Sequence, residues 1–336
     1  MHDMHAPTKA EFHTRLYDFL ASNDSFCYRT KGKYLLAKCE PRLAKPVAEL
    51  GLGDRYHRSQ RLRCHEGNRS RRTHLMRTPI YQLDAFTTRR FAGNPAAVMP
   101  MNSFLGDATL QAIAAENNLA ETAFLVPEGG DYRLRWFTPA TEVPLCGHAT
   151  LASATVVMER LEPARSSVVF HSASGPLTVN RAEAGYVMQF PARTAESVAA
   201  PPGLAEALGV VPVAVFVNAF NYMALLANAK AVRELSPDIA AIARLDRSGL
   251  IVTAPGDGIY DFVSRYFAPA KGIPEDPVTG VAHCMLTPYW AKQLNKKEFR
   301  AFQASPRGGE VICRLTESGV ELEGSCVFYL EGEVEI

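Results

Sequence analysis

The chain has 336 residues, with 36 Lys and Arg against 35 Asp and Glu, and 47% of its residues are hydrophobic. This composition is that of an ordinary globular protein, and the length allows two domains with sizeable cores. No apolar run reaches the ~18 residues that a membrane-spanning helix needs, so we expect no membrane span.

The first 77 residues differ in charge from the rest. They contain 16 Lys and Arg against 8 Asp and Glu, whereas the remaining residues contain 20 against 27. Three interpretations fit this basic leader: an arm for nucleic acid or an acidic partner, a targeting peptide, or a non-native extension upstream of Met76. We favour the extension, because residues 1–77 show little periodicity and lack the apolar segment of a targeting peptide. Their cysteines, Cys27, Cys39 and Cys64, lack zinc-finger spacing.

From residue 78 onward the pattern predicts two domains, 78–191 and 192–336, and the last strand could return to the first domain. In the first domain we expect strands at 80–86, 96–99, 123–126, 132–137, 167–171, 177–180 and 186–190, and helices at 107–117 and after Gly147. A Pro- and Ala-rich stretch at 191–203 is the predicted linker. In the second domain we expect helices at 230–244 and 280–294 and strands at 213–218, 222–226, 249–253, 260–266, 299–304, 310–315, 320–323 and 327–331.

One construction occurs twice, as WFTPATEVPLCGHAT at 136–150 and YFAPAKGIPEDPVTGVAH at 266–283. Each copy ends a strand, passes through a Pro-containing loop and reaches a glycine before an apolar segment. The segment after Gly147 is apolar nearly all round, which predicts a buried helix. A glycine at a helix start lets a ligand approach the backbone, and the free N–H groups there attract an anion. Gly147 and Gly280 could instead only shape tight turns, but the matched pair favours a site for a small acid between two domains.

Four titratable residues lie in or beside these loops. Glu121 is placed in a short turn between a helix and a strand, as a general base with a raised pKa or as a plain surface acid. His148 is a packed core histidine or a site residue, and Asp276 is a cap for the helix that follows or a site residue. Cys146 is a candidate nucleophile or base. Position alone leaves these alternatives open.

Several kinds of site lack support. The chain has no GxGxxG after a strand, no GxxxxGK[ST], no HExxH and no GxSxG. We therefore expect no cofactor and no metal. The basic residues of 78–336 do not alternate with aromatic ones, so we expect no nucleic-acid partner. The four cysteines of residues 78–336 show no paired framework, which indicates a reducing, cytoplasmic compartment.

Four motifs together resemble the phenazine-biosynthesis isomerase-like (PhzF-like) family over residues 79–336. They are DAFTTRRFAGNPAAV at 84–98, NNLAETAFL at 117–125, RWFTPATEVPLCGHATLA at 135–152 and SRYFAPAKGIPEDPVTGVAH at 264–283. The resemblance implies an α+β, diaminopimelate-epimerase-like fold of two pseudo-repeated domains, each a strand-rich barrel around a central helix. It implies a cofactor-independent isomerase that shifts a proton on a small-molecule carboxylate substrate in the interdomain cleft, and a possible homodimer.

The resemblance also assigns roles to residues. Glu121 matches the catalytic acid/base, and His148 and Asp276 match residues that assist proton transfer. The residues implied to bind substrate are Asn94, Gly147, Gly280 and Val281.

The family usually has Ser where this chain has Val281. The backbone N–H is kept but a hydroxyl is lost, so another small acid fits at least as well as the phenazine-pathway substrate. A racemase or epimerase of the same fold is an alternative, although it would need two opposed cysteines and only Cys146 is placed for this. A non-catalytic binding module is the other alternative.

Overall fold

The structure, a computed structural model, describes residues 76–336, so the predicted leader lies outside the described residues up to position 75. The fold begins slightly earlier than the predicted domain boundary. Strand β1 (Arg77–Ala85) pairs Arg77 with Glu335, and the N–H of Met76 donates to the carbonyl of Ile336 at 3.0 Å. No helix among residues 76–336 is long and apolar enough to cross a membrane.

The first half of the fold is a set of strands wrapped around one helix. After β1 it contains β2 (Asn94–Pro100), α3 (Asp107–Asn117), β3 (Glu121–Glu128), β4 (Asp131–Phe137), β5 (Glu142–Val143), α4 (Gly147–Val156), the π-helical turn η3 (Val157–Leu161), β6 (Ser167–Ser172), β7 (Gly175–Ala182) and β8 (Gly185–Phe190). Neighbouring strands follow the order β1-β2-β3-β4-β6-β7-β8.

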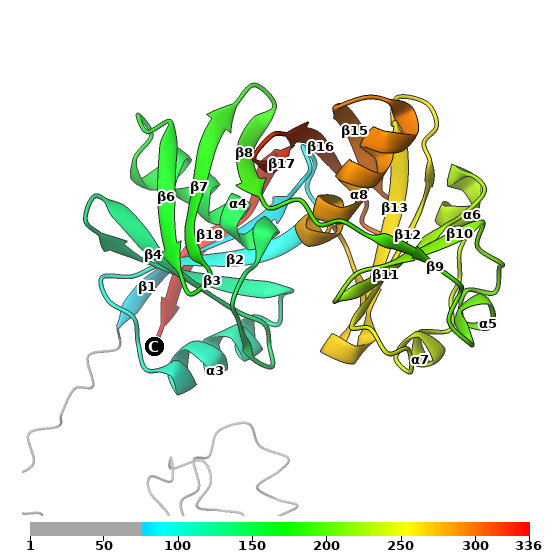
Figure 1. Cartoon of the computed structure of the whole chain (residues 1–336). Coiled ribbons are helices and arrows are strands. Elements are labelled where there is room, and N and C mark those ends of the chain that lie inside the picture. The colour runs from blue at the N-terminus through cyan, green and yellow to red at the C-terminus, as the bar shows by residue number, and fades with distance from the viewer. Residues whose placement is uncertain (1–75) are drawn as a thin grey trace, which may run out of the picture. The chain divides into compact units, whose positions relative to one another are not determined.

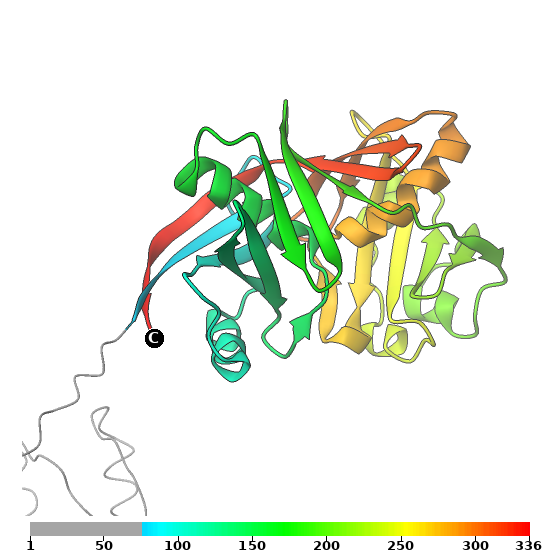
Figure 2. The same ribbon diagram turned by 60° about the vertical axis from the view of Figure 1, so that its left-hand side comes forward.

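The second half repeats this plan around α8 (Gly280–Leu294). Its other elements are β9 (Glu196–Val198), α5 (Leu204–Leu208), β10 (Ala214–Val217), β11 (Asn221–Leu225), α6 (Ala229–Arg233), α7 (Ile239–Ile242), β12 (Gly249–Pro255), β13 (Phe262–Ala268), the 3-10 turn η4 (Pro269–Lys271), β14 (Ile273–Asp276), β15 (Glu298–Gln303), β16 (Gly309–Thr316) and β17 (Gly319–Gly324). The last strand, β18 (Cys326–Glu335), pairs antiparallel with β1, and Figures 1 and 2 both show these two strands side by side. Strand β17 pairs with β8, so one run of paired strands connects the two halves.

Helix α4 is the buried axis of the first half, as its mostly apolar sequence predicts. Every residue from His148 to Val156 is buried, and the helix contacts β1, β2, β3, β8 and β18 (Figure 1). The hydroxyls of Thr150, Ser153 and Thr155 donate to carbonyls one turn earlier at 2.6–2.9 Å. These bonds satisfy the only polar side chains of α4 after His148, so the helix can be fully buried without unpaired hydroxyl groups.

The predicted linker at 191–203 is hydrogen-bonded to α8 because of a proline within that helix. Pro288 lies inside the helix and has no N–H, so it cannot bond the carbonyl of Cys284 one turn earlier. That carbonyl accepts the backbone N–H of Arg193 at 2.9 Å instead. The chain between the halves therefore runs beside α8, and β9 within it pairs with β10.

The predicted helix at 230–244 is wrong. The segment forms two short helices, α6 and α7, separated at Ser236-Pro237. Proline disfavours helical backbone at the preceding residue, and the Asp238 side chain accepts the N–H of Ala241 to start a new helix. The sequence prediction also missed α5 and the short strands β5, β9 and β14.

Candidate active site

Glu121 is the first residue of β3 rather than part of a turn. The strand starts there because β3 pairs in parallel with β2, where Glu121 is the partner of Ala96. Helix α3 ends just before it, with Asn118 in the left-handed region at φ 49°. The Glu121 side chain is buried, with 8% of the residue exposed, so the interpretation as a plain surface acid is wrong.

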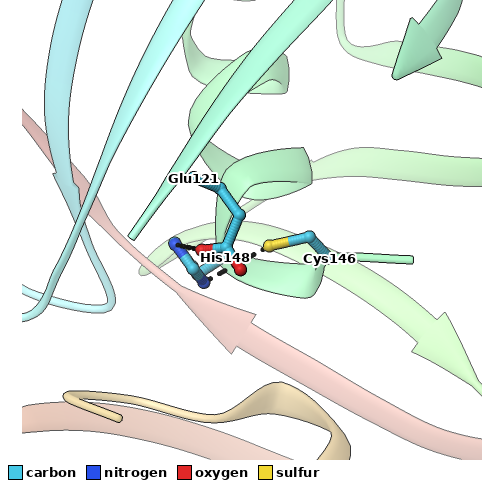
Figure 3. Close-up of side chains that lie close together, drawn as sticks. All are labelled: Glu121, Cys146 and His148. Carbon is cyan, nitrogen blue, oxygen red and sulfur yellow. Dashed lines mark hydrogen bonds and ion pairs between the residues drawn. The ribbon is translucent and has the colours of Figure 1, made fainter. Parts of the chain in front are cut away.

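His148 lies against Glu121 at the start of α4. Its Nε2 is 3.0 Å from Glu121 Oε2, and its Nδ1 is 3.5 Å from the Sγ of Cys146 (Figure 3). The Nε2–H does not point closely enough at Oε2 for a hydrogen bond, and neither atom has a hydrogen-bond partner among the described residues. Both buried atoms therefore keep their bonding capacity for a third group.

The protonation states of Cys146 and His148 follow from their burial and from their contacts with each other and with Glu121. Burial and the Glu121 carboxylate raise the pKa of the Cys146 thiol, so the thiol stays protonated near neutral pH. Burial acts to lower the pKa of His148, but the Cys146 sulfur, as a hydrogen-bond acceptor, and the Glu121 carboxylate outweigh burial and raise that pKa well above 6.5. The ring is then an imidazolium whose two nitrogens are both donors, beside the Glu121 carboxylate.

Asp276 ends β14 and lies near the same pair. Its Oδ1 accepts from Asn94 Nδ2 at 2.7 Å and its Oδ2 accepts from the hydroxyl of Thr279 at 2.5 Å. Burial raises the pKa of Asp276 to about 6, with opposite contributions from His148, which lowers it, and Glu121, which raises it. Asp276 is not the side-chain cap of α8, because the N-cap residue is Thr279 and no side chain caps that helix.

Gly147 and Gly280 lie against each other at the starts of α4 and α8. An ideal Cβ on Gly147 would be 3.9 Å from the Cα of Gly280 and 3.6 Å from Phe190, and one on Gly280 would be 3.6 Å from Leu322. These are ordinary contact distances, and neither glycine has a positive φ. The fold therefore requires glycine at neither position, which argues against the tight-turn interpretation. Neither helix start has a side-chain cap.

The remaining predicted residues lie close to these. Asn94 is fully buried at the start of β2, donates also to the carbonyl of Val278 at 2.9 Å and has an unpartnered Oδ1 among the described residues. Val281 is the second residue of α8, where a backbone N–H has no partner within the helix.

The two acidic side chains at 275 and 276 have different partners. Glu275 accepts two hydrogen bonds from the Arg265 guanidinium at 2.7 and 2.9 Å, while Asp276 accepts one from Asn94. Adjacent side chains of a strand point to opposite faces, and the short strand β14 accounts for the split. The sequence analysis missed β14, and it missed Thr279, whose hydroxyl bonds Asp276.

Glu121, Cys146 and His148 also form the one group of three potential metal ligands found in residues 76–336, with ligand atoms within 4.8 Å of one another. In this arrangement Sγ faces Nδ1 and Oε2 faces Nε2. The two ring nitrogens point in different directions, so an ion at this place would bind only one of them. The expectation of no metal stays a prediction.

Comparisons with known proteins agree with the fold. The family model for phenazine biosynthesis-like protein matches residues 83–332. An uncharacterised isomerase of Pseudomonas aeruginosa is 48% identical over 261 residues, which are 78% of this chain and 100% of that protein. A PhzF-family protein of Enterococcus faecalis superposes with a TM-score of 0.76 at 43% identity, covering 78% of this chain and 100% of the other.

More distant structures share the fold alone. A hydroxyproline epimerase of Agrobacterium vitis superposes with a TM-score of 0.52 at 11% identity, covering 77% of this chain and 93% of that one. These neighbours confirm the predicted α+β, diaminopimelate-epimerase-like fold.

Proposed function

The chain belongs to the phenazine biosynthesis-like (PhzF) family of isomerases, and from this premise we propose that it shifts a proton within a small carboxylate-bearing substrate without a cofactor. Glu121 removes a proton from a carbon of the substrate and returns one at another position. His148 and Asp276 set the protonation states that this cycle needs. Such a cycle requires a base whose position and pKa are controlled by its neighbours.

The buried pair of Glu121 and His148 carries this proposal. The positive charge of the His148 imidazolium lies directly beside the carboxylate that is to take up the proton. Glu121 Oε2 and His148 Nε2 are both buried and unpartnered within the described residues, so a carbon-bound proton can approach one and a developing negative charge the other. Asp276, with a pKa of about 6, adds a group that holds or releases a proton near neutral pH.

Positive potential near the pair supports a carboxylate on the substrate. The starts of α4 and α8 direct backbone N–H groups from two helices to one place, and neither start is capped by a side chain. Lys271 and Arg193 add charge beside Asp276: burial and Arg193 lower the pKa of Lys271, and Asp276 raises it. The contact between Gly147 and Gly280 leaves no space for a carboxylate between the two Cα atoms, so we place it beside them.

Glu121→Gln tests the proposal. A thermal-shift screen of small carboxylic acids against the full chain first selects compounds that raise the melting temperature. The selected acids are then incubated with enzyme and EDTA in deuterated water, and proton NMR follows isomer formation and deuterium uptake. Glutamine keeps the shape of Glu121 but carries no transferable proton, so we expect turnover to fall at least ~10²-fold while ligand binding persists.

Glu116→Gln is the matched control, because Glu116 is an exposed acid at the end of α3, five residues away. It should turn over at the wild-type rate. Wild-type turnover by Glu121→Gln would refute the assignment. Inversion of a stereocentre with loss of all activity in Cys146→Ala would instead identify a cysteine-based racemase, and binding without any exchange would identify a binding module.

A further inference from the structure

Cys146 is a buried polar group that the proposed proton shift does not use. It is the N-cap residue of α4, and 7% of it is exposed. Its carbonyl accepts the N–H of Thr150 at 3.2 Å and the Thr150 hydroxyl at 2.6 Å, which fixes the backbone around it. Its Sγ is 3.5 Å from Nδ1 of His148, within the range of a sulfur hydrogen bond.

The direction of this bond follows from the charges that face the ring. Glu121 faces it from β3 and Cys146 from the start of α4, while Asp276 is close enough from β14 for its charge and that of His148 to interact. The imidazolium has a donor on each nitrogen, and a thiol sulfur is a weak acceptor. Nδ1–H therefore donates to Sγ, while Nε2–H is on the side of Glu121.

We infer that Cys146 is a positioning residue, whose Sγ accepts the Nδ1–H of His148 and thereby holds the ring with its Nε2–H beside Glu121. The inference rests on the proposed function, since it explains how His148 is kept in place for the proton shift. Without an acceptor at this point, Nδ1–H would be buried and unpaired, which costs free energy and favours loss of its proton. The positive charge beside the Glu121 carboxylate would then be lost.

Ring-nitrogen NMR of the full chain tests this without any substrate. Long-range proton–nitrogen spectra of ¹⁵N-labelled protein report protonation at each imidazole nitrogen, and His148→Gln identifies the His148 signals. In the wild type we expect both nitrogens of His148 to be protonated at neutral pH. In Cys146→Ala we expect the titration midpoint to move to lower pH, with proton binding weakened about fivefold, since one hydrogen bond contributes about 1 kcal/mol.

Two further variants separate a specific bond from a general disturbance. Cys146→Ser should keep the midpoint at or above the wild-type value, because a hydroxyl is the better acceptor. Cys284→Ala removes a buried cysteine of α8, which bonds Gly280 and not His148, so it should leave the midpoint unchanged. If Cys146→Ala does not fold, Cys146→Ser decides alone.

Three results would overturn the inference: an unprotonated Nδ1 in the wild type, a wild-type midpoint in Cys146→Ala, or a low midpoint in Cys146→Ser. None of them bears on whether Glu121 moves a proton, which only the exchange assay measures. Failure of the positioning role and failure of the proposed isomerase activity are therefore distinguishable.

Discussion

Glu121 and Asp276 show how individual side chains acquire chemistry from distant parts of the chain. Glu121 is buried because β3 pairs with β2, and Asp276 is held by Asn94, 182 positions earlier. The sequence motifs selected both residues, but not their environments. Burial and partners depend on contacts between segments far apart in sequence, which no local pattern contains.

Asp276→Asn should stabilise the protein at high pH. The folded-state pKa of Asp276 is raised from 3.8 to about 6, so the folded state disfavours its carboxylate. The full cost is present above pH 6 and disappears as pH falls through 6 toward 3.8, because the folded protein then takes up the proton first. The raised pKa corresponds to about 3 kcal/mol, which we reduce to roughly 2 because the residue is partly exposed.

Thermal unfolding at pH 8 and pH 4 checks this expectation. The variant should unfold at a higher temperature than wild type at pH 8, and the difference should shrink at pH 4. Asparagine keeps one acceptor oxygen for Asn94 but loses the acceptor of the Thr279 hydroxyl, so the part of the difference that changes between pH 8 and pH 4 reports the lost charge. If the difference in unfolding temperature between variant and wild type is the same at both pH values, the pKa of Asp276 is not raised in the folded state.

At the level of helices, sequence prediction succeeded where local signals are strong. The predicted bounds of α3 and α8 match the structure, and both helices end at an asparagine in the left-handed region, Asn118 and Asn295. The predicted helix at 230–244 is not formed, because Ser236-Pro237 interrupts helical backbone despite the Ala-rich composition. The start of α4 was predicted from Gly147, but its contact with Gly280 depends on the whole fold.

Helix α8 contains a buried titratable group, His283, which should make stability depend on pH. Its Nδ1–H donates to the carbonyl of Thr279 at 2.9 Å, its Nε2 has no partner in the described part, and its ring lies against Phe262. Burial lowers its pKa from 6.5 to about 4. The unfolded chain therefore binds the proton first, and the fold loses stability as pH falls from 6.5 to 4, by up to about 3 kcal/mol.

His283→Gln removes this titration and can still donate to Thr279. Urea unfolding at pH 7 and pH 4.5 should show a smaller loss of unfolding free energy in the variant than in wild type. Asp276 acts in the opposite direction over part of this range, but it is present in both proteins and cancels. His171→Gln, an exposed change in β6, is the control and should lose as much as wild type. An equal loss in His283→Gln would mean that His283 is protonated in the fold.

For the molecule as a whole, the paired strands make the two halves interdependent. Strand β18 returns from the second half to pair with β1, and β17 pairs with β8. The boundary predicted between 191 and 192 lies between β8 and β9. The sequence prediction allowed the last strand to return to the first domain, as β18 does, but it did not include the pairing of β17 with β8. The pairing of strands so far apart in sequence depends on how the entire sheet packs, and not on the residues of either strand alone.

The part of the chain that carries the fold should be stable by itself from Met76 onward. The Pseudomonas aeruginosa relative is matched over its full length by 78% of this chain. The described fold starts at the pairing of Met76 with Ile336 and of β1 with β18. A chain that begins at Met76 should therefore unfold within about 1 °C of the full chain, less than the ~2–4 °C that 1 kcal/mol shifts in a protein of this size.

Removing residues 326–336 instead deletes β18 and leaves β1 paired on one edge only, so cooperative unfolding should be lost. Calorimetry of both truncations decides the matter: a clear fall in melting temperature after removal of residues 1–75 would show that the basic leader contributes to the fold.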